Sequence, residues 1–434
     1  MSIKRILAIV LAIILFCFYL CNLSTANSID DLAYVIGLGF DVSENNKLKL
    51  SFQFAKPESY SSEGSSSTSE SKGEDESTII TTIECNSINE GIKKINTYIE
   101  KRINLSYCKI AVFSENVAEQ GIMDYVSTLM NNIEIRPYCD ILVSKCEAKY
   151  FLENSAPLLK KLSAKYYESA EFSEKDTGFT RIVTLLDFYN SYYDSNTDSI
   201  AMLGDVVPYI DKDTTNNDDK AEENDNENSE DSEKKNEAEN IAKEIKKENS
   251  KDKKVLNISG LAVFNDGKFR GEFNEIETLC NLIVSNRLKS SEITIPSPFD
   301  ENEFISLYIS KAKSENTVHI IDGRPFIQCN VKISARILSN TTSSNYMSKE
   351  NKKKIEEAAS NYFTEQIANY INKTIMELKS DVSGFGNYAI RNTKKFKNEK
   401  AWKDFNWGEK YQSAVFEVRT SVNLKSSYLI IGIN

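Results

Sequence analysis

The sequence predicts an α+β protein made of several mixed α/β lobes, with small twisted sheets flanked by helices and a long amphipathic helix near the C-terminus. Three observations predict this class. Apolar residues alternate with polar ones in KLKLSFQF, which begins at residue 47, as in a strand with one solvated face. Strand and helix patterns alternate along residues 87–193. Residues 349–379 carry apolar side chains at helical spacing.

The N-terminus has the pattern of an export signal. Lys4 and Arg5 precede an apolar run over residues 6–20. As a helix this run would be about 23 Å long, which is shorter than the ~30 Å core of a bilayer. Residues 1–27 are therefore predicted to be a signal or anchor segment that takes the rest of the chain out of the cytoplasm. Three outcomes stay open: lipidation of Cys21, an uncleaved anchor, and cleavage after Ala26.

Residues 28–210 are predicted to form an N-terminal domain. It opens with a hairpin, because the apolar stretch 32–40 and the alternating stretch 48–54 flank a polar turn. Residues 57–78 are rich in Ser and Glu and are expected to form a disordered loop. Further helices are expected at four places: one begins at Ser87, one runs from Ser114 through Leu129, and the other two cover 147–152 and 180–193. Strands are expected at 109–113 and 139–143.

Residues 211–255 are predicted to be an acidic, low-complexity linker between two lobes. The net charge of −11 lies entirely in two polar segments, 57–78 with −5 and 211–254 with −6. The remainder of the chain is balanced and has no basic stripe of the kind that nucleic acid requires. Nucleic acid is therefore not expected as a partner.

Residues 256–434 are predicted to form a C-terminal domain, and a division into two lobes near residue 296 stays open. Asn265, Asp266 and Gly267 have the composition of a hairpin turn. The further elements expected here are a helix at 275–288, strands at 304–309, 318–321 and 326–338, and the long helix at 349–379.

The stretch SGFGNYA, from residue 383, satisfies the loose form of a dinucleotide-binding fingerprint. Such a fingerprint leaves a strand and opens a helix, whereas this one follows the longest helix. Gly384, Phe385 and Gly386 are therefore interpreted as a structural turn, with one glycine at positive φ and Phe385 packed beneath it. No cofactor is predicted.

No catalytic or metal-binding residue is predicted. The only histidine, His319, is expected to be partly buried in a strand. Asp30 and Asp31 are adjacent, so on a strand they point to opposite faces. The pairs Tyr166–Tyr167 and Tyr192–Tyr193 are interpreted as packing residues. Six cysteines lie beyond the leader without CxxC spacing, and Cys108, Cys139 and Cys329 are expected to be buried.

Four motifs, taken in order, resemble one known family. They are IDDLAYVIGLGFDV from residue 29, YCKIAVFSENVAEQG from residue 107, ISGLAVFNDGKF from residue 258 and SDVSGFGNYAI from residue 380. The family is that of the Ger(x)C proteins, the C-subunits of bacterial spore germinant receptors. The resemblance implies a non-enzymatic protein held by a lipid at Cys21 on the outer face of the spore inner membrane. It also implies assembly with A-type and B-type membrane subunits.

Two alternatives stay beside this reading. An exported solute-binding protein would need polar residues that converge in a cleft between lobes. A cell-wall enzyme would need two carboxylates about 5–10 Å apart in a groove, which is a mechanism that uses no histidine.

Overall fold

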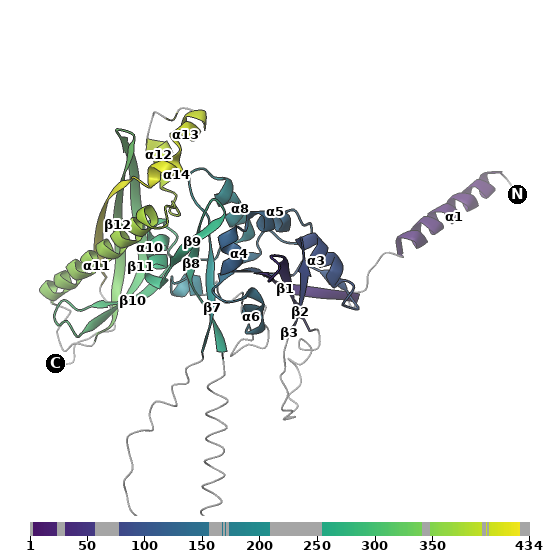
Figure 1. The fold of residues 1–434 in the computed structure, drawn as a ribbon, viewed down its shortest axis with the longest axis horizontal. Coiled ribbons are helices and arrows are strands. Elements are labelled where there is room, and N and C mark those ends of the chain that lie inside the picture. The colour runs from purple at the N-terminus through teal and green to yellow at the C-terminus, as the bar shows by residue number, and fades with distance from the viewer. Residues whose placement is uncertain are drawn as a thin grey trace, which may run out of the picture.

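The computed structural model describes residues 3–23, 31–56, 78–155, 167, 170, 173–208, 254–340, 348–392, 396 and 399–425. Within these residues the strands form two sheets, which lie side by side along the long axis of the molecule (Figure 1). Helices flank both sheets, and a long helix crosses the second one. The predicted mixed α/β class is confirmed.

The first sheet has nine strands in the order β3-β2-β1-β5-β6-β7-β8-β9, with β4 paired to the start of β1. Strands β1, β4, β5, β6 and β7 run parallel, and the strands at either side run antiparallel to their neighbours. The strands are β1 (Leu32–Val42), β2 (Leu48–Ala55), β3 (Thr78–Cys85), β4 (Arg102–Asn104), β5 (Ile110–Ser114), β6 (Asp140–Ser144), β7 (Ile200–Pro208), β8 (Lys254–Asn265) and β9 (Lys268–Phe273).

Helices cover both faces of this sheet because its central strands are apolar on both sides. In β5, Ile110 and Val112 belong to a small cluster with α6, whereas Ala111 and Phe113 belong to the large core on the opposite face. Such continuous apolar runs are typical of parallel strands buried on both faces. The helices are α3 (Ile88–Ile95), α4 (Glu115–Gln120), α5 (Met123–Met130), α6 (Ala148–Glu153) and α8 (Leu185–Tyr193).

Two predicted helices have different bounds. The helix expected from Ser114 through Leu129 is interrupted at Gly121, whose φ of +112° no helix can continue, so α4 and α5 are separate. The helix expected from residue 180 begins only at Leu185. Thr184 has an extended backbone, pairs with Asp140 in an isolated bridge, and caps the helix in a capping box with Asp187.

Strands β7 and β8 pair antiparallel along most of their length, from Pro208 opposite Lys254 to Ile200 opposite Val263. Residues 209–253 therefore connect two neighbouring strands of one sheet. The prediction that 211–255 link two separate lobes is wrong in this respect, because the first sheet continues through β9 to residue 273. The predicted hairpin β8–β9 is confirmed, with Asp266 and Gly267 both at positive φ as a tight hairpin turn requires.

The second sheet has four strands in the order β10-β11-β12-β13. They are β10 (Ser291–Pro296), β11 (Phe304–Ile321), β12 (Arg324–Asn340) and β13 (Val415–Leu424). The two strands expected at 304–309 and 318–321 are one strand of 18 residues. Polar residues in the middle of this strand led to the prediction of a break. Ser314 and Asn316 nevertheless face inward and are buried, because the Ser314 hydroxyl donates to Oδ1 of Asn316 and the Asn316 amide donates to the carbonyl oxygen of Val284.

Helix α11 (Lys349–Met376) confirms the predicted long amphipathic helix and crosses the second sheet, as Figure 1 shows. Ser348 caps it, and its buried face is formed by residues at helical spacing, among them Ile355, Ala359, Phe363 and Ile367. Short helices follow: α12 (Phe385–Asn392), α13 (Glu399–Phe405) and α14 (Trp407–Tyr411).

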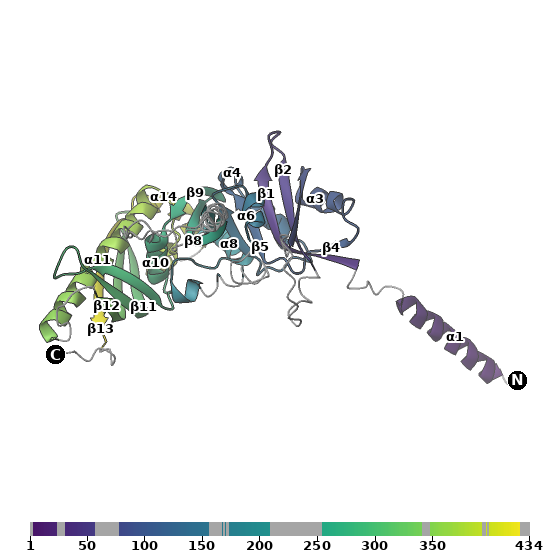
Figure 2. The ribbon, with the colours of Figure 1, turned by 90° about the horizontal axis from the view of Figure 1, so that it is seen from below.

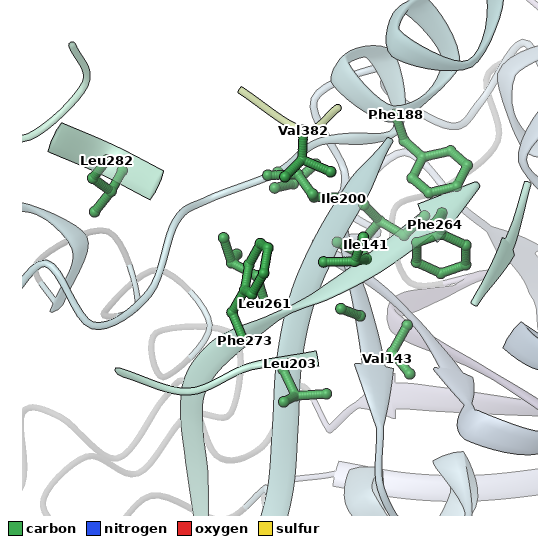
Figure 3. Close-up of a cluster of buried hydrophobic side chains, with 14 of the residues drawn as sticks. Ile141, Val143, Phe188, Ile200, Leu203, Leu261, Phe264, Phe273, Leu282 and Val382 are labelled. Atoms are coloured by element: carbon green, nitrogen blue, oxygen red, sulfur yellow. The ribbon is translucent and has the colours of Figure 1, made fainter. Parts of the chain in front are cut away.

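Helix α10 (Glu275–Val284) joins the two sheets. Every residue from Thr278 to Val284 is buried, so this helix is enclosed all round. It follows β9 of the first sheet directly and packs against β8, β11 and α11. Figure 3 shows the resulting core, in which Leu261, Phe273, Leu282 and Val382 lie together with side chains of β6, β7 and α8.

The leader positions 3–23 form helix α1 (Ile3–Leu23). Among the residues that the structure describes, no helix has the length and apolarity needed to cross a membrane. Except for Thr78, which opens β3, the loop predicted at 57–78 lies outside the described residues, as do residues 211–253 of the predicted linker.

Replacing residues 212–250 by a Gly/Ser linker of about ten residues should leave the fold intact, because β7 and β8 are adjacent. Each halving of a loop lowers its closure cost by about 0.6 kcal/mol, so we expect a gain of about 1 kcal/mol in the free energy of unfolding. Denaturant unfolding of the shortened and full chains measures this difference. A shortened chain that loses cooperative unfolding would contradict the pairing of β7 with β8.

Candidate functional site at the junction of the two sheets

The carboxylate of Asp381 lies buried at the junction of the two sheets and accepts three hydrogen bonds. Its Oδ1 accepts from the backbone N–H of Phe385 at 3.0 Å. Its Oδ2 accepts from the N–H of Gly386 at 2.8 Å and from Nε1 of Trp407 at 2.9 Å. Asp381 thus supplies the anion that the amino end of α12 favours, and it holds the start of α14 to the same point.

The local sequence explains this placement. Helix α11 ends at Met376, and the chain then turns through residues 377–384, where Gly384 has a φ of +69°. This left-handed residue reverses the chain so that α12 begins immediately at Phe385, with its first N–H groups directed at Asp381.

The loop between α8 and β7 completes the site from the other half of the chain. The backbone N–H of Asp198 donates to the Asp381 carbonyl oxygen at 2.9 Å, and the N–H of Asp381 donates to Oδ2 of Asp198 at 2.7 Å. The hydroxyl of Thr197 donates to the same carbonyl at 2.9 Å. Segments far apart in the sequence are therefore joined by three hydrogen bonds around one residue.

Both carboxyl groups have a raised pKa. Burial raises the pKa of Asp381 to about 6, against the lowering effect of its three N–H donors. Burial, and then the charge of Asp381, raise the pKa of Asp198 to about 7. Both carboxyl groups therefore keep their protons to a higher pH than an exposed aspartate does.

A second polar network lies beside the first. Asn281 on α10 donates to the hydroxyl of Tyr370 at 2.8 Å and accepts from Arg181 at 3.2 Å. The Tyr370 hydroxyl also lies 2.7 Å from the hydroxyl of Ser383. Because buried polar groups are costly unless satisfied, this network fixes α10, α11 and the segment around Ser383 relative to one another.

A cavity of about 220 Å³ opens at the junction. Its walls carry Asp198, Asp194, Asp266, Tyr192 and Trp407. This volume is below the ~300 Å³ at which pockets for small organic ligands begin. Of the two carboxylates, only that of Asp198, which is half-buried, faces the cavity, since Asp381 is enclosed and already holds three donors.

The predicted turn residues all lie at this site. Gly384 has the positive φ, whereas Gly386 lies in α12 and has no room for a side chain, because a Cβ there would be 2.5 Å from the Asn196 carbonyl oxygen. Phe385 is fully buried and stacks on Tyr411 with ring centroids 6.3 Å apart. The nucleotide site was rejected because the glycines follow a helix, but the turn also opens a helix, α12. The N–H groups of Phe385 and Gly386 at the start of that helix donate to Asp381.

The other candidate residues lie apart from the junction or only at its rim. His319 is exposed on β11, so the expectation of partial burial is wrong. Asp31 is exposed, and Asp30 lies outside the described residues, as does Tyr166. Tyr167 is buried and donates to Oε1 of Gln53 at 2.9 Å, while Tyr192 lines the cavity and Tyr193 is exposed.

The cysteines carry no functional geometry within the described part of the chain. Cys108, Cys139 and Cys329 are buried as expected, and all three are free thiols. No cluster of His, Cys, Asp or Glu in the described residues could hold a metal ion. Cys21 lies in α1, and its lipidation stays a prediction.

Asp198, Asp381 and Trp407 were not predicted from the sequence. One signal was present, since Asp381 is an acidic residue within SDVSGFG, four residues before a phenylalanine that opens a helix. An aspartate at this distance is outside the spacing of a standard N-cap, and its bond to Trp407 depends on tertiary structure.

Comparisons with known proteins identify the class of this protein. Residues 25–205 match the spore germination protein N-terminal domain, and residues 259–428 match the domain described as spore germination B3/GerAC like, C-terminal. The chain therefore belongs to the Ger(x)C family of spore germination proteins, as the resemblance implied. The junction joins the two family domains, because Asp198 belongs to the first and Asp381 to the second.

Individual relatives are distant. The chain is 22% identical to the putative spore germination protein YfkR of Bacillus subtilis (strain 168), over 73% of this chain and 72% of the relative. It is 18% identical to spore germination protein GerQC of Bacillus cereus, over 75% and 76%. A search of solved structures finds the crystal structure of the GerBC protein, with a TM-score of 0.47 and 14% identity over 90% of this chain and 97% of that one.

Gly386→Ala should destabilise the junction, because the added methyl meets the Asn196 carbonyl. Overpacking of this kind costs about 1–3 kcal/mol. Gly408→Ala is the matched control: Gly408 lies in α14, and a Cβ there meets nothing within 4 Å. It should be neutral or stabilising by up to about 1 kcal/mol. Thermal unfolding of both variants measures the difference, and equal effects would contradict the close approach at Asn196.

The raised pKa values predict a pH dependence of stability. Between pH ~4 and ~7 the folded chain holds protons on Asp198 and Asp381 that the unfolded chain has released, so this pair makes stability fall as pH rises. Asp198→Asn should flatten the fall, whereas Asp404→Asn, an exposed control on α13, should not. Melting temperatures at several pH values in this window test this, and an unchanged slope in Asp198→Asn would refute it.

Proposed function

We propose that this protein is the C-type subunit of a spore germinant receptor and is needed for nutrient-triggered germination. It acts without catalysis, through contacts with A-type and B-type membrane subunits. The observation that supports the proposal most strongly is that both domains of the Ger(x)C family follow one another in order behind an apolar leader. The name of the relative GerQC, a spore germination protein, supports the same role.

We place the protein on the outer face of the spore inner membrane, tethered through its N-terminus. The basic residues and apolar run at the start of the chain support export. A diacylglyceryl group on Cys21 would be the tether, because acyl chains partition into the bilayer by about 0.8 kcal/mol for each buried CH₂. The family resemblance supports this lipid.

A role in protein contacts fits the chemistry of the junction. A two-carboxylate hydrolase presents both acids to the sugar. In this protein Asp381 is enclosed and engaged by three N–H donors, so of the bonded pair only Asp198 faces the cavity, which Asp194 and Asp266 also line. The pair therefore supports an architectural role for the junction.

The test is a pull-down of the tagged full-length protein from spore inner membranes in mild detergent, with mass spectrometry of the N-terminal peptide. We expect recovery of two membrane subunits and a diacylglyceryl group on Cys21. Cys17→Ala, a substitution in the same helix, should leave both unchanged, whereas Cys21→Ala should lose the lipid. Recovery of the protein alone, with a free N-terminus near Asn27, would contradict the proposal and favour an exported solute-binding protein.

A further inference from the structure

Exposed aromatic and apolar side chains gather at one edge of the first sheet, where its parallel strands begin. The register places Leu32 of β1 opposite Arg102 of β4, and Gly37 of β1 opposite Ile110 of β5. Ile110 in turn lies opposite Asp140 of β6. The residues that precede β4, β5 and β6 therefore emerge at the same edge as the start of β1.

Four large side chains at this edge are mostly exposed. Tyr98, in the turn that leads into β4, is 73% exposed, and Tyr107, before β5, is 55% exposed. In the loop before β6, Ile133 is 100% exposed and Tyr138 is 75% exposed. We call these four residues the amino-edge surface. All four side chains belong to segments that lead into strands beginning at this edge, and Ile133 has its whole side chain in water.

The loops that carry this surface are held to one another. The rings of Tyr34 and Tyr107 meet edge to face at 5.1 Å, and the guanidinium carbon of Arg136 lies 6.0 Å from the Tyr107 ring centroid. Oε2 of Glu134 accepts from the N–H of Leu105 at 3.0 Å. The loop with Ile133 and Tyr138 therefore keeps a fixed position beside Tyr107.

The chain connects this edge to the leader over a short distance. Helix α1 ends at Leu23 and β1 begins at Leu32. A fully extended chain spans only about 30 Å between these two residues, and only about 40 Å from Cys21, the proposed tether, to Leu32. Whatever holds the leader therefore holds the amino edge of the first sheet close to itself.

The composition of the edge matches a membrane–water interface. Tyrosine is enriched at that depth because its ring is apolar and its hydroxyl is polar. The exposed Lys101, Arg102 and Arg136 have long stems that can lie along apolar surface while their charges reach phosphate groups. Asp31 and Glu100 are exposed nearby, so the edge has mixed charge and the aromatic and apolar side chains are its distinguishing feature.

We propose that the amino-edge surface rests on the lipid headgroup region of the membrane, with Ile133 and Tyr138 inserted among the headgroups. The proposal rests on the proposed function, since it requires the leader to be held in a membrane. It also sets an orientation: the second sheet lies at the opposite end of the molecule from β4 (Figure 2), so it points away from the bilayer.

The experiment uses the protein purified from spore membranes with its native N-terminal tether, in vesicles of phosphatidylethanolamine and phosphatidylglycerol that contain lipids with a doxyl quencher near the headgroup. Ile133→Trp places a fluorophore on the amino-edge surface, and Ile321→Trp places one at the far end of β11, where Ile321 is 57% exposed. The native Trp402 and Trp407 contribute equally to both variants. We expect the added tryptophan to be quenched several-fold more strongly in Ile133→Trp than in Ile321→Trp.

The outcomes separate the two proposals. Equal quenching in a protein that floats with the vesicles would overturn the surface contact, leave the tether standing, and assign the edge to a protein partner. A protein that does not float with the vesicles would overturn both. Since Ile133 makes no buried contact, its substitution leaves the folded core unchanged, and circular dichroism of both variants verifies this.

Discussion

The position of one carboxylate determines how the two halves of this protein fit together. Asp381 is buried, so its charge is stable only because three N–H donors surround it, two from the start of α12 and one from Trp407. Its backbone is bonded in both directions to the loop before β7. Removing the carboxylate would leave three buried donors without a partner, each of them costly. The closing turn, two short helices and the first domain therefore depend on this residue.

The rest of the junction follows from how α10 is placed. This helix leaves the last strand of the first sheet and is enclosed by the second sheet and α11, so it belongs to both cores. Lys373 on α11 forms an ion pair with Glu277 on α10 at 2.8 Å and also bonds the Glu272 carbonyl of β9. Because both side chains of the pair are largely withdrawn from water, it is more than a surface contact. The arrangement of the two sheets is thus fixed by polar contacts as well as by burial.

The elements of the fold that were predicted correctly from the sequence are those determined by patterns within one short stretch of chain. The hairpins β1–β2 and β8–β9 follow from alternation and from an Asp-Gly turn, and α11 follows from its spacing. The pairing of β7 with β8 spans 45 intervening residues, 209–253, and no local pattern signals it. Strand β11 was divided in the prediction because its inward positions Ser314 and Asn316 are polar, and only their partners at the end of α10 make that burial acceptable.

For the candidate site, the sequence identified the turn at Gly384 and the burial of Phe385 but not the reason for either. The fingerprint-like glycines were set apart from nucleotide binding because they follow a helix, whereas they also open a helix, whose N–H groups such a ligand would use. The ligand of those groups is Asp381 of the same chain. That assignment requires knowing that α12 faces back toward residue 381, which tertiary structure alone reveals.

The most direct test of this account is guanidinium unfolding of the wild type and of Asp381→Ala, with two probes that monitor different parts of the protein during unfolding. Fluorescence reports on Trp402 and Trp407, the only tryptophans, and hydrogen exchange reports on β5 and β6 in the first sheet. The account predicts coincident transitions in the wild type. In Asp381→Ala it predicts that the fluorescence transition moves to lower denaturant and separates from the exchange of the first sheet. Coincident transitions with an unchanged midpoint in the variant would contradict it.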